Sequence, residues 1–324
     1  MKFIKKIKPE IWGILFLCLV FLLISKNVYY ITLFVFCGIY IIAVSGLDVL
    51  FGYSGQISLG HAMFYATGAY TSSLLALQGV PVWIGIFAGI AVSILLAAVV
   101  AIPASKLVHQ FLALLTIAVG NMVYVFLSKA KVTGAMTGVK NIPDLSIFGI
   151  MLDTKLKFGI FMLVMIVLFL FIKSRIINSS TGRALMAIRE DVVAADGIGI
   201  NVRKYKILAF IISAVFTSFA GSMYAHFVGY ISPDGFTGTQ SILLLTMLLF
   251  GGAGNMVGPI CGAVVITIMN ETLQGFSTYK TLIYGIVILL AILFMPRGVF
   301  GLVQDIIRKI KSSFGRPVKK NAEN

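Results

Sequence analysis

The chain has 324 residues, of which 59% are hydrophobic and 11% charged, with 26 Lys and Arg against 11 Asp and Glu. Soluble domains average about 45–50% apolar and about 25% charged residues. This composition therefore excludes a soluble enzyme, a disordered chain and a nucleic-acid-binding domain. It predicts an all-α polytopic membrane protein.

Ten apolar blocks, separated by polar breaks, approach the roughly 20 residues that a bilayer-spanning helix needs. In chain order they cover residues 11–25, 28–47, 60–77, 82–102, 108–128, 156–172, 207–228, 241–254, 257–274 and 281–296. Ten spans in a single transmembrane domain, 1–324, is the prediction. Nine spans, or eight plus a re-entrant segment, is the alternative. The first and eighth blocks are short for a full crossing.

Basic residues between the blocks give the orientation. With both termini in the cytoplasm, 19 Lys and Arg residues lie inside and seven outside. Cytoplasmic loops carry such an excess, so N and C termini are predicted to be cytoplasmic. The segments outside the spans are then basic cytoplasmic tails, 1–10 and 297–324, an extracytoplasmic loop, 129–155, and a cytoplasmic loop, 173–206. The C-terminal tail is expected to lie on membrane lipid.

The segment after the second span, residues 52–61, is rich in glycine and small polar residues. Irregular backbone at membrane depth persists only where protein buries it or water reaches it, and transporters build their sites from such broken helices. An ordinary inner loop is the alternative. Asn121 is the deepest strongly polar side chain within a span. The candidate substrate-pathway residues are Gly52, Tyr53, Ser54, Gly55, Gln56, Ser58, Gly60, His61 and Asn121.

A short echo of this segment follows the seventh span, where 229–238 again begins with Gly-Tyr. The two segments are predicted to face opposite sides of the membrane. Spans 2–5 and 7–10 would then be inverted repeats with a pathway between them.

Ionisable side chains are rare within the spans. The four exceptions lie at predicted span ends: Asp48, His61, His226 and Glu271. From there a side chain can extend to the membrane–water interface, which would account for a charged or polar group at each position. The pathway is accordingly expected to be mostly apolar and to lack a central charge.

The cytoplasmic loop contains a predicted helix over 181–197, with Thr181 or Ser180 capping its start and Gly197 ending it in a left-handed conformation. One face is apolar, formed by Leu185, Ile188, Val192 and Ala195. Such a helix either lies on the inner leaflet or docks on a cytoplasmic partner. Its acidic residues, Glu190, Asp191 and Asp196, favour docking, because anionic lipid repels carboxylates.

Gly254, Gly258 and Gly262 recur every four residues, a spacing that lets two transmembrane helices approach closely. Helix packing is the expected role, and an interface between two permeases is the alternative.

The Gly-Tyr-Ser-Gly-Gln-Ile-Ser-Leu-Gly-His run at 52–61 resembles the signature of branched-chain amino acid permeases of ATP-binding-cassette (ABC) importers, the LivM type. Residues 193–199 look like the EAA…G loop by which such permeases dock on their ATPases, although Val193 stands where Glu is usual. The resemblance continues through 194–201, 205–206, 219–221 and 249–255. The expected docking residues are Arg183, Glu190, Asp191, Ala194, Ala195 and Gly199.

This resemblance implies a permease that moves leucine, isoleucine and valine across the bacterial inner membrane. Its partners would be a second, LivH-like permease, two cytoplasmic ATPases and an extracytoplasmic binding protein, with no nucleic acid. Urea, short amides or another small polar solute is the alternative cargo. An ion-coupled carrier acting alone is the rival mechanism, but it would want a central acid.

Nucleotide-binding and metal-binding patterns are absent from the sequence. The chain has no G-x-x-x-x-G-K-[ST] loop, no HExxH and no paired cysteines. We therefore expect no cofactor, no metal and no enzymatic activity in this chain, with ATP hydrolysed on a partner subunit.

Overall fold

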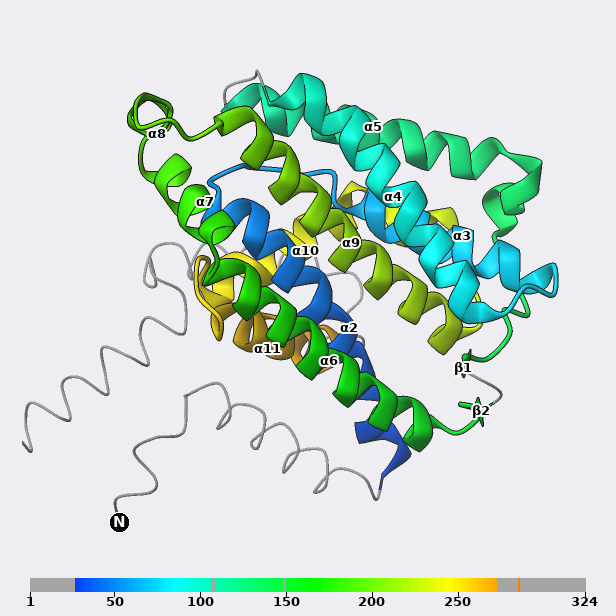
Figure 1. The fold of residues 1–324 in the computed structure, drawn as a ribbon. Coiled ribbons are helices and arrows are strands. Elements are labelled where there is room, and N and C mark those ends of the chain that lie inside the picture. Colours follow the sequence, from blue (N-terminus) through cyan, green and yellow to red (C-terminus); the bar gives the residue numbers. More distant parts are fainter. Residues whose placement is uncertain (1–26, 106–108, 148–149, 273–284, 286–324) are drawn as a thin grey trace, which may run out of the picture.

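The computed structural model describes residues 27–105, 109–147, 150–272 and 285 (Figure 1). The predicted spans 11–25 and 281–296 and both basic tails, 1–10 and 297–324, lie outside the described residues.

The described chain is helical, which confirms the all-α polytopic class. Its long helices are α2 (Val28–Asp48), α3 (Ala62–Leu77), α4 (Val82–Ala104), α5 (His109–Lys129), α6 (Lys155–Ile177), α9 (Val202–Val228), α10 (Gly238–Gly251) and α11 (Gly258–Thr272). Each matches one predicted block, with ends that differ by a few residues. Five described segments are long and apolar enough to cross a membrane: α2 with its extension to Tyr53, α4, most of α5, α6 and α9.

Short elements join these helices. The segment between α6 and α9 holds α7 (Ser180–Glu190) and α8 (Val192–Gly197), and the π-helical turn η2 (Val49–Tyr53) extends α2. The 3-10 turns are η3 (Lys131–Thr133), η4 (Ala135–Thr137) and η5 (Pro233–Phe236). A small hairpin pairs β1 (Ser146–Ile147) antiparallel with β2 (Ile150–Met151), with Ser146 opposite Met151.

Helices α2 and α9 form the centre of the bundle. The α2 span is 89% buried, as expected for a helix that is apolar all round. Helix α9 packs on α2, α3 and α4. By contrast, only 17% of the α5 span is buried, and Figure 1 shows α5 along the edge of the molecule. The outer faces of α4, α5 and α6 are thus left for lipid or for a partner.

The central helices cross closely because glycines face backbone. A Cβ on Gly68 of α3 would lie 2.0 Å from the Ser218 carbonyl oxygen, and one on Gly221 of α9 would lie 2.0 Å from that of Tyr65. Contacts between real Cβ atoms and oxygen are never this short, so both positions require glycine.

Helices α10 and α11 also approach closely because glycines face backbone. A Cβ on Gly262 would lie 1.8 Å from the Met247 carbonyl oxygen, and one on Gly258 would lie 1.9 Å from that of Gly252. Gly254 lies in the turn between the helices, with φ +78°. We propose that Gly258 and Gly262 serve helix packing and that Gly254 serves the turn.

Helices α2 and α9 run in opposite directions (Figure 1). The segment after α2 therefore lies at the end of the bundle that carries α7 and α8, and the segment after α9 lies at the other end, near the hairpin. There Ile231 bridges to Val139 in the loop between α5 and α6, and the Ile142 N–H donates to the Gly229 carbonyl oxygen at 3.1 Å. This is the arrangement that the inverted-repeat prediction requires.

The single helix predicted over 181–197 is wrong in detail. The chain breaks at Asp191, which is extended (φ −153°, ψ 117°) and accepts hydrogen bonds from the N–H groups of Val193 and Ala194 at 2.8 and 3.0 Å. Asp191 thus caps α8. Helix α7 begins after Ser179, and the left-handed residue is Gly199 (φ +86°), not Gly197.

The expected placement of span-end ionisable groups at the interface is also wrong for three of the four. Asp48 and His61 are fully buried and His226 is 2% exposed. Each has a polar partner inside the protein; His226 Nδ1 lies 2.8 Å from the Pro143 carbonyl oxygen. Lys173, assigned to the cytoplasmic loop, lies instead within α6 and is fully buried.

Candidate transport pathway and coupling site

The irregular segment after α2, which we call the break, begins at Gly52, where the backbone lies close to the Asp48 side chain at the end of α2 and to the α10–α11 turn. A Cβ there would lie 1.9 Å from Asp48 Oδ1 and 2.4 Å from the Gly254 nitrogen. Three residues later Gly55 is left-handed, with φ +70°. The two glycines let the chain leave the helix through the π turn η2 and continue as irregular backbone inside the protein.

Beside this break lies a buried ion pair, which we call the Asp48–Lys173 pair. Lys173 Nζ lies 2.8 Å from Asp48 Oδ2, and neither side chain is exposed. The Gly254 N–H donates to Asp48 Oδ1 at 2.7 Å, and Lys173 Nζ donates to the Asn255 carbonyl oxygen at 3.3 Å. Buried charges are tolerated when paired and hydrogen-bonded in this way. The pair joins α2, α6 and the α10–α11 turn.

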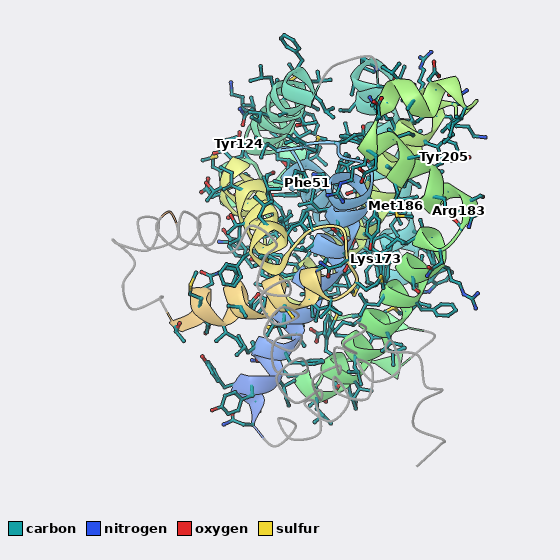
Figure 2. The ribbon with its side chains drawn as sticks, turned by 90° about the vertical axis from the view of Figure 1, so that its left-hand side faces the viewer. Phe51, Tyr124, Lys173, Arg183, Met186 and Tyr205 are labelled. Carbon is teal, nitrogen blue, oxygen red and sulfur yellow. The ribbon has the colours of Figure 1, made fainter. Side chains whose placement is uncertain are left out.

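Arg189 reaches the same region from α7. Its Nη1 donates to the Gly52 carbonyl oxygen. In Figure 2, Lys173 on α6 lies near α7, while Arg183 lies at the rim of the molecule. Asp48, Lys173 and Arg189 were missed as a group because they are far apart in sequence. One sequence feature could have suggested the pair. Asp48 and Lys173 each follow directly after a predicted span, and both of these span ends are predicted to lie on the same side of the membrane.

The rest of the break is hydrogen-bonded to α9 and α5. Gln56 Nε2 donates to Ser54 Oγ at 2.9 Å and to the Lys206 carbonyl oxygen at 3.2 Å. The Leu59 N–H donates to Thr116 Oγ1 at 3.1 Å. The Leu59 N–H and the Gln56 side-chain amide thus find hydrogen-bond partners within the protein, as polar groups at membrane depth require.

The break ends where two short helices meet. His61 Nε2 lies 2.7 Å from Ser213 Oγ of α9, and the Ala62 N–H at the start of α3 donates to Ser241 Oγ in the first turn of α10 at 2.8 Å. Helices α3 and α10 have 16 and 14 residues, fewer than the roughly 20 of a full span. Both therefore begin inside the bundle and run toward opposite ends.

A cavity of about 120 Å³ lies at this meeting point. Its lining residues are Leu59, Gly60, Ala62, Ile117, Gly120, Asn121, Phe236, Gly238, Ser241 and Ile242. Of the predicted pathway residues, Gly60 and Asn121 line the cavity. Gly52, Tyr53, Ser54, Gln56 and Ser58 are buried in the break, whereas Gly55 is half-buried. His61 packs on Phe64 and Phe210.

The predicted docking residues lie on α7, on α8 and in the turn after α8, at one end of the bundle. Arg183, Glu190, Asp191, Ala194 and Gly199 are exposed, whereas Ala195 is 2% exposed. The predicted apolar face of the loop helix points inward: Leu185 and Ile188 are 1% and 2% exposed, and Leu185 packs in the core with α9 residues. That face is therefore not available to the leaflet.

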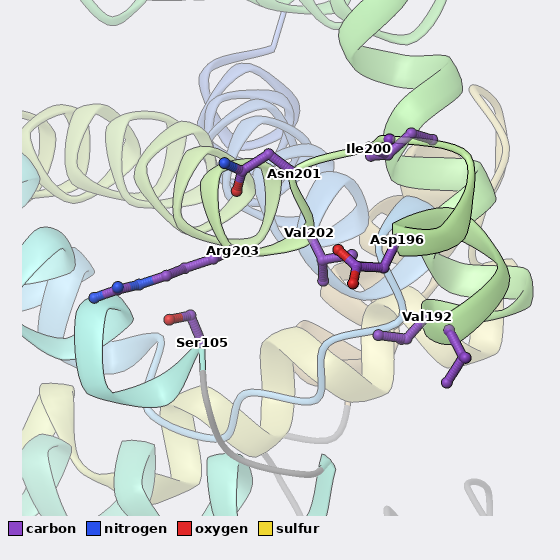
Figure 3. Close-up of a pocket in the computed structure, with 9 residues that line it drawn as sticks. Ser105, Val192, Asp196, Ile200, Asn201, Val202 and Arg203 are labelled. Carbon is purple, nitrogen blue, oxygen red and sulfur yellow. The ribbon is translucent and has the colours of Figure 1, made fainter.

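A hollow of about 540 Å³ separates α8 from the start of α9 and the end of α4 (Figure 3). It is lined by Ser105, Val192, Val193, Asp196, Gly199, Ile200, Asn201, Val202 and Arg203. Figure 3 shows Asp196 and Arg203 on opposite sides of it. Among the described residues, no group of three or more His, Cys, Asp or Glu is placed to hold a metal ion.

Broken helices around a small, mostly apolar cavity with two polar side chains, in a multi-pass helical protein, are typical of a membrane transport protein. The family model described as "branched-chain amino acid transport system / permease component" matches residues 29–293. The chain belongs to this family and is a multi-pass permease of the cytoplasmic membrane. Membership describes a transport component rather than an enzyme.

Individual relatives agree with the family match. The chain is 31% identical to the high-affinity branched-chain amino acid transport system permease protein LivM of Salmonella typhimurium, over 85% of this chain and 70% of the relative. It is 32% identical to LivM of Escherichia coli K12, over 80% and 67%. It is 24% identical to the permease protein LivH of Salmonella typhimurium, over 81% and 91%. No solved structure matches the chain.

Proposed function

We propose that the chain is a permease subunit of an ABC importer that carries leucine, isoleucine and valine into the cytoplasm, with both its termini inside. It would act with a second, LivH-like permease, two cytoplasmic ATPases that hydrolyse ATP and an extracytoplasmic binding protein. The observation that carries the proposal is the meeting of α3 and α10 at a cavity within a chain of this family.

The cavity suits an amino acid with an apolar side chain. Ile117, Phe236 and Ile242 supply apolar wall, while Asn121 and Ser241 supply polar groups. A zwitterion with a branched aliphatic side chain needs both kinds of contact. Urea would leave the apolar wall without a partner.

The cavity lies at the surface of this chain. Asn121, Gly238 and Thr239 are exposed beside side chains such as Met122, which is 68% exposed. Polar groups are costly against lipid at this depth. We infer that the second permease covers this face, so that the substrate moves between the two permeases.

The α8 surface suits an ATPase. Val193 is 80% exposed and Ile198 is 76% exposed, with the carboxylates of Glu190 and Asp196 nearby in sequence and also exposed. Apolar side chains flanked by acids fit a protein groove with basic edges better than an anionic leaflet.

Replacing Val193 and Ile198 together by Asp is expected to reduce co-purification of the ATPases by at least tenfold, because each substitution buries a charge in the docking surface. Ala195 is unsuitable for this test, because it is buried and its enlargement would disturb the fold. The measurement is the ATPase-to-permease ratio after detergent extraction and affinity purification.

Val132 is the matched control, because it is an apolar residue in η3, 75% exposed at the opposite end of the bundle. Val132→Asp is expected to leave the ratio unchanged. A wild-type ratio for the Val193/Ile198 double variant would overturn the docking proposal.

Asn121→Leu is expected to lower isoleucine uptake about tenfold, because a hydrogen bond to a charged substrate group contributes about 1.5–3 kcal/mol. The measurement is initial uptake into proteoliposomes that hold the full transporter. The neighbouring Met122→Leu, on the exposed face of α5, is expected to transport normally.

Competition identifies the cargo in the same assay. Unlabelled leucine and valine are expected to compete with isoleucine, and urea is not. Uptake that urea inhibits and branched-chain amino acids do not would overturn the substrate assignment.

A further inference from the structure

Arg189 connects the cytoplasmic helix α7 to the interior of the bundle. Its guanidinium Nη1 donates to the carbonyl oxygen of Gly52, which belongs to the π turn η2 at the end of α2. The hydrogen-bond pattern of an α-helix changes at such a turn. This carbonyl therefore receives a donor from another helix.

The Arg189 side chain lies between two glycine-containing segments. A Cβ on Gly55 would lie 3.3 Å from Arg189 Cγ, and a Cβ on Gly254 would lie 2.6 Å from Arg189 Nη1. The side chain thus contacts the break after α2 on one side and the α10–α11 turn on the other. A larger residue at Gly254 would displace the guanidinium.

The Asp48–Lys173 pair already ties these two segments together, through the Gly254 N–H and the Asn255 carbonyl oxygen. A displacement of Arg189 would therefore act on a joined unit of α2, α6 and the α10–α11 turn. This unit continues into the two broken segments that end at the cavity. Helix α7, by contrast, packs through Leu185 and Ile188 and has exposed residues on its other side.

We propose that Arg189 is a positioning residue that transmits the movement of α7 to the break after α2 and the α10–α11 turn, and so couples ATP hydrolysis to opening of the pathway. The inference rests on the proposed function, because it requires an ATPase that moves α7. It assigns the coupling to one side chain that no docking surface includes. A guanidinium suits this role because its planar fork of donors holds its direction on a carbonyl, whereas a lysine ammonium does not.

The test compares Arg189→Met and Arg189→Lys in the full transporter, reconstituted in proteoliposomes with loaded binding protein. ATPase co-purification and the stimulation of hydrolysis by binding protein are expected to remain near wild type. Isoleucine uptake per ATP hydrolysed is expected to fall at least tenfold in Arg189→Met and less in Arg189→Lys. A residue that merely stabilised the fold would lower uptake and hydrolysis together, with their ratio unchanged.

Arg175→Met is the matched control, because Arg175 is an exposed arginine on α6 whose guanidinium lies 4.9 Å from the centre of the Phe171 ring. It is expected to keep the wild-type ratio. A wild-type ratio in Arg189→Met would overturn the coupling role, and so would parallel loss of uptake and hydrolysis. Absence of ATP-dependent uptake by the wild-type transporter would instead overturn the proposed function.

Discussion

Lys173→Met is expected to destabilise the folded protein by about 3–5 kcal/mol, the usual consequence of removing one member of a buried ion pair. Neither Lys173 nor Asp48 is exposed, so the remaining carboxylate would keep the Gly254 N–H as its donor and lose its countercharge. The measurement is the fraction of protein that stays monodisperse in detergent after heating, compared with wild type.

The double variant Asp48→Asn with Lys173→Met separates charge from packing. It removes both charges at similar side-chain volume, and such replacements are often neutral. Most of the lost stability is therefore expected to return. The surface pair Lys157–Asp153, at 2.7 Å with both side chains about half exposed or more, is the control. Lys157→Met is expected to leave the heating curve unchanged. Equal curves for Lys173→Met and Lys157→Met would contradict the stabilising role of the buried pair.

Span positions could be predicted from the sequence because they depend on local composition. A run of apolar residues near bilayer length forms a helix whatever surrounds it, so blocks such as 82–102 and 156–172 match α4 and α6 closely. The glycine-rich run at 52–61 likewise predicted broken backbone. Neither inference needs a contact between distant residues.

The Asp48–Lys173 pair could not be predicted in this way, because its partners lie 125 residues apart. A lysine at the edge of an apolar block looks like a loop residue until a carboxylate on a neighbouring helix is known. Long-range contacts decide such positions, and a single sequence does not contain them.

The break between α7 and α8 was within reach of sequence reasoning. Asp191 precedes a short run of small and apolar residues, the pattern of a helix cap, but it was interpreted as part of an acidic cluster. The repeated Gly-Tyr dipeptide, at 52–53 and 229–230, shows that similar sequence does not guarantee similar backbone structure. Gly229 is left-handed (φ +75°) and ends α9, whereas Gly52 makes a close contact inside a π turn. The same dipeptide therefore meets two different backbone requirements.

Gly60→Ala is expected to destabilise the protein by about 1–3 kcal/mol, the range for overpacking a core, and to abolish most isoleucine uptake. The new Cβ would lie 2.1 Å from the carbonyl oxygen of Thr116 in α5. Backbone cannot yield as a flexible side chain does, so α5 must move away from the cavity. The movement would also break the hydrogen bond from the Leu59 N–H to Thr116 Oγ1.

Gly120→Ala is the control that isolates this contact, because Gly120 faces Gly60 across the same crossing. Its Cβ would lie 3.5 Å from Gly60 Cα, an ordinary contact, and alanine favours a helix by up to about 1 kcal/mol over glycine. Gly120→Ala should therefore raise thermal stability slightly, while Gly60→Ala lowers it. Since φ is not positive at Gly60, alanine suffers no left-handed backbone strain there, and a difference in thermal stability between the two variants reports on the α5 contact. Equal thermal stability of the two variants would mean that α5 does not close on the break at Gly60, and the cavity would lose its α5 wall.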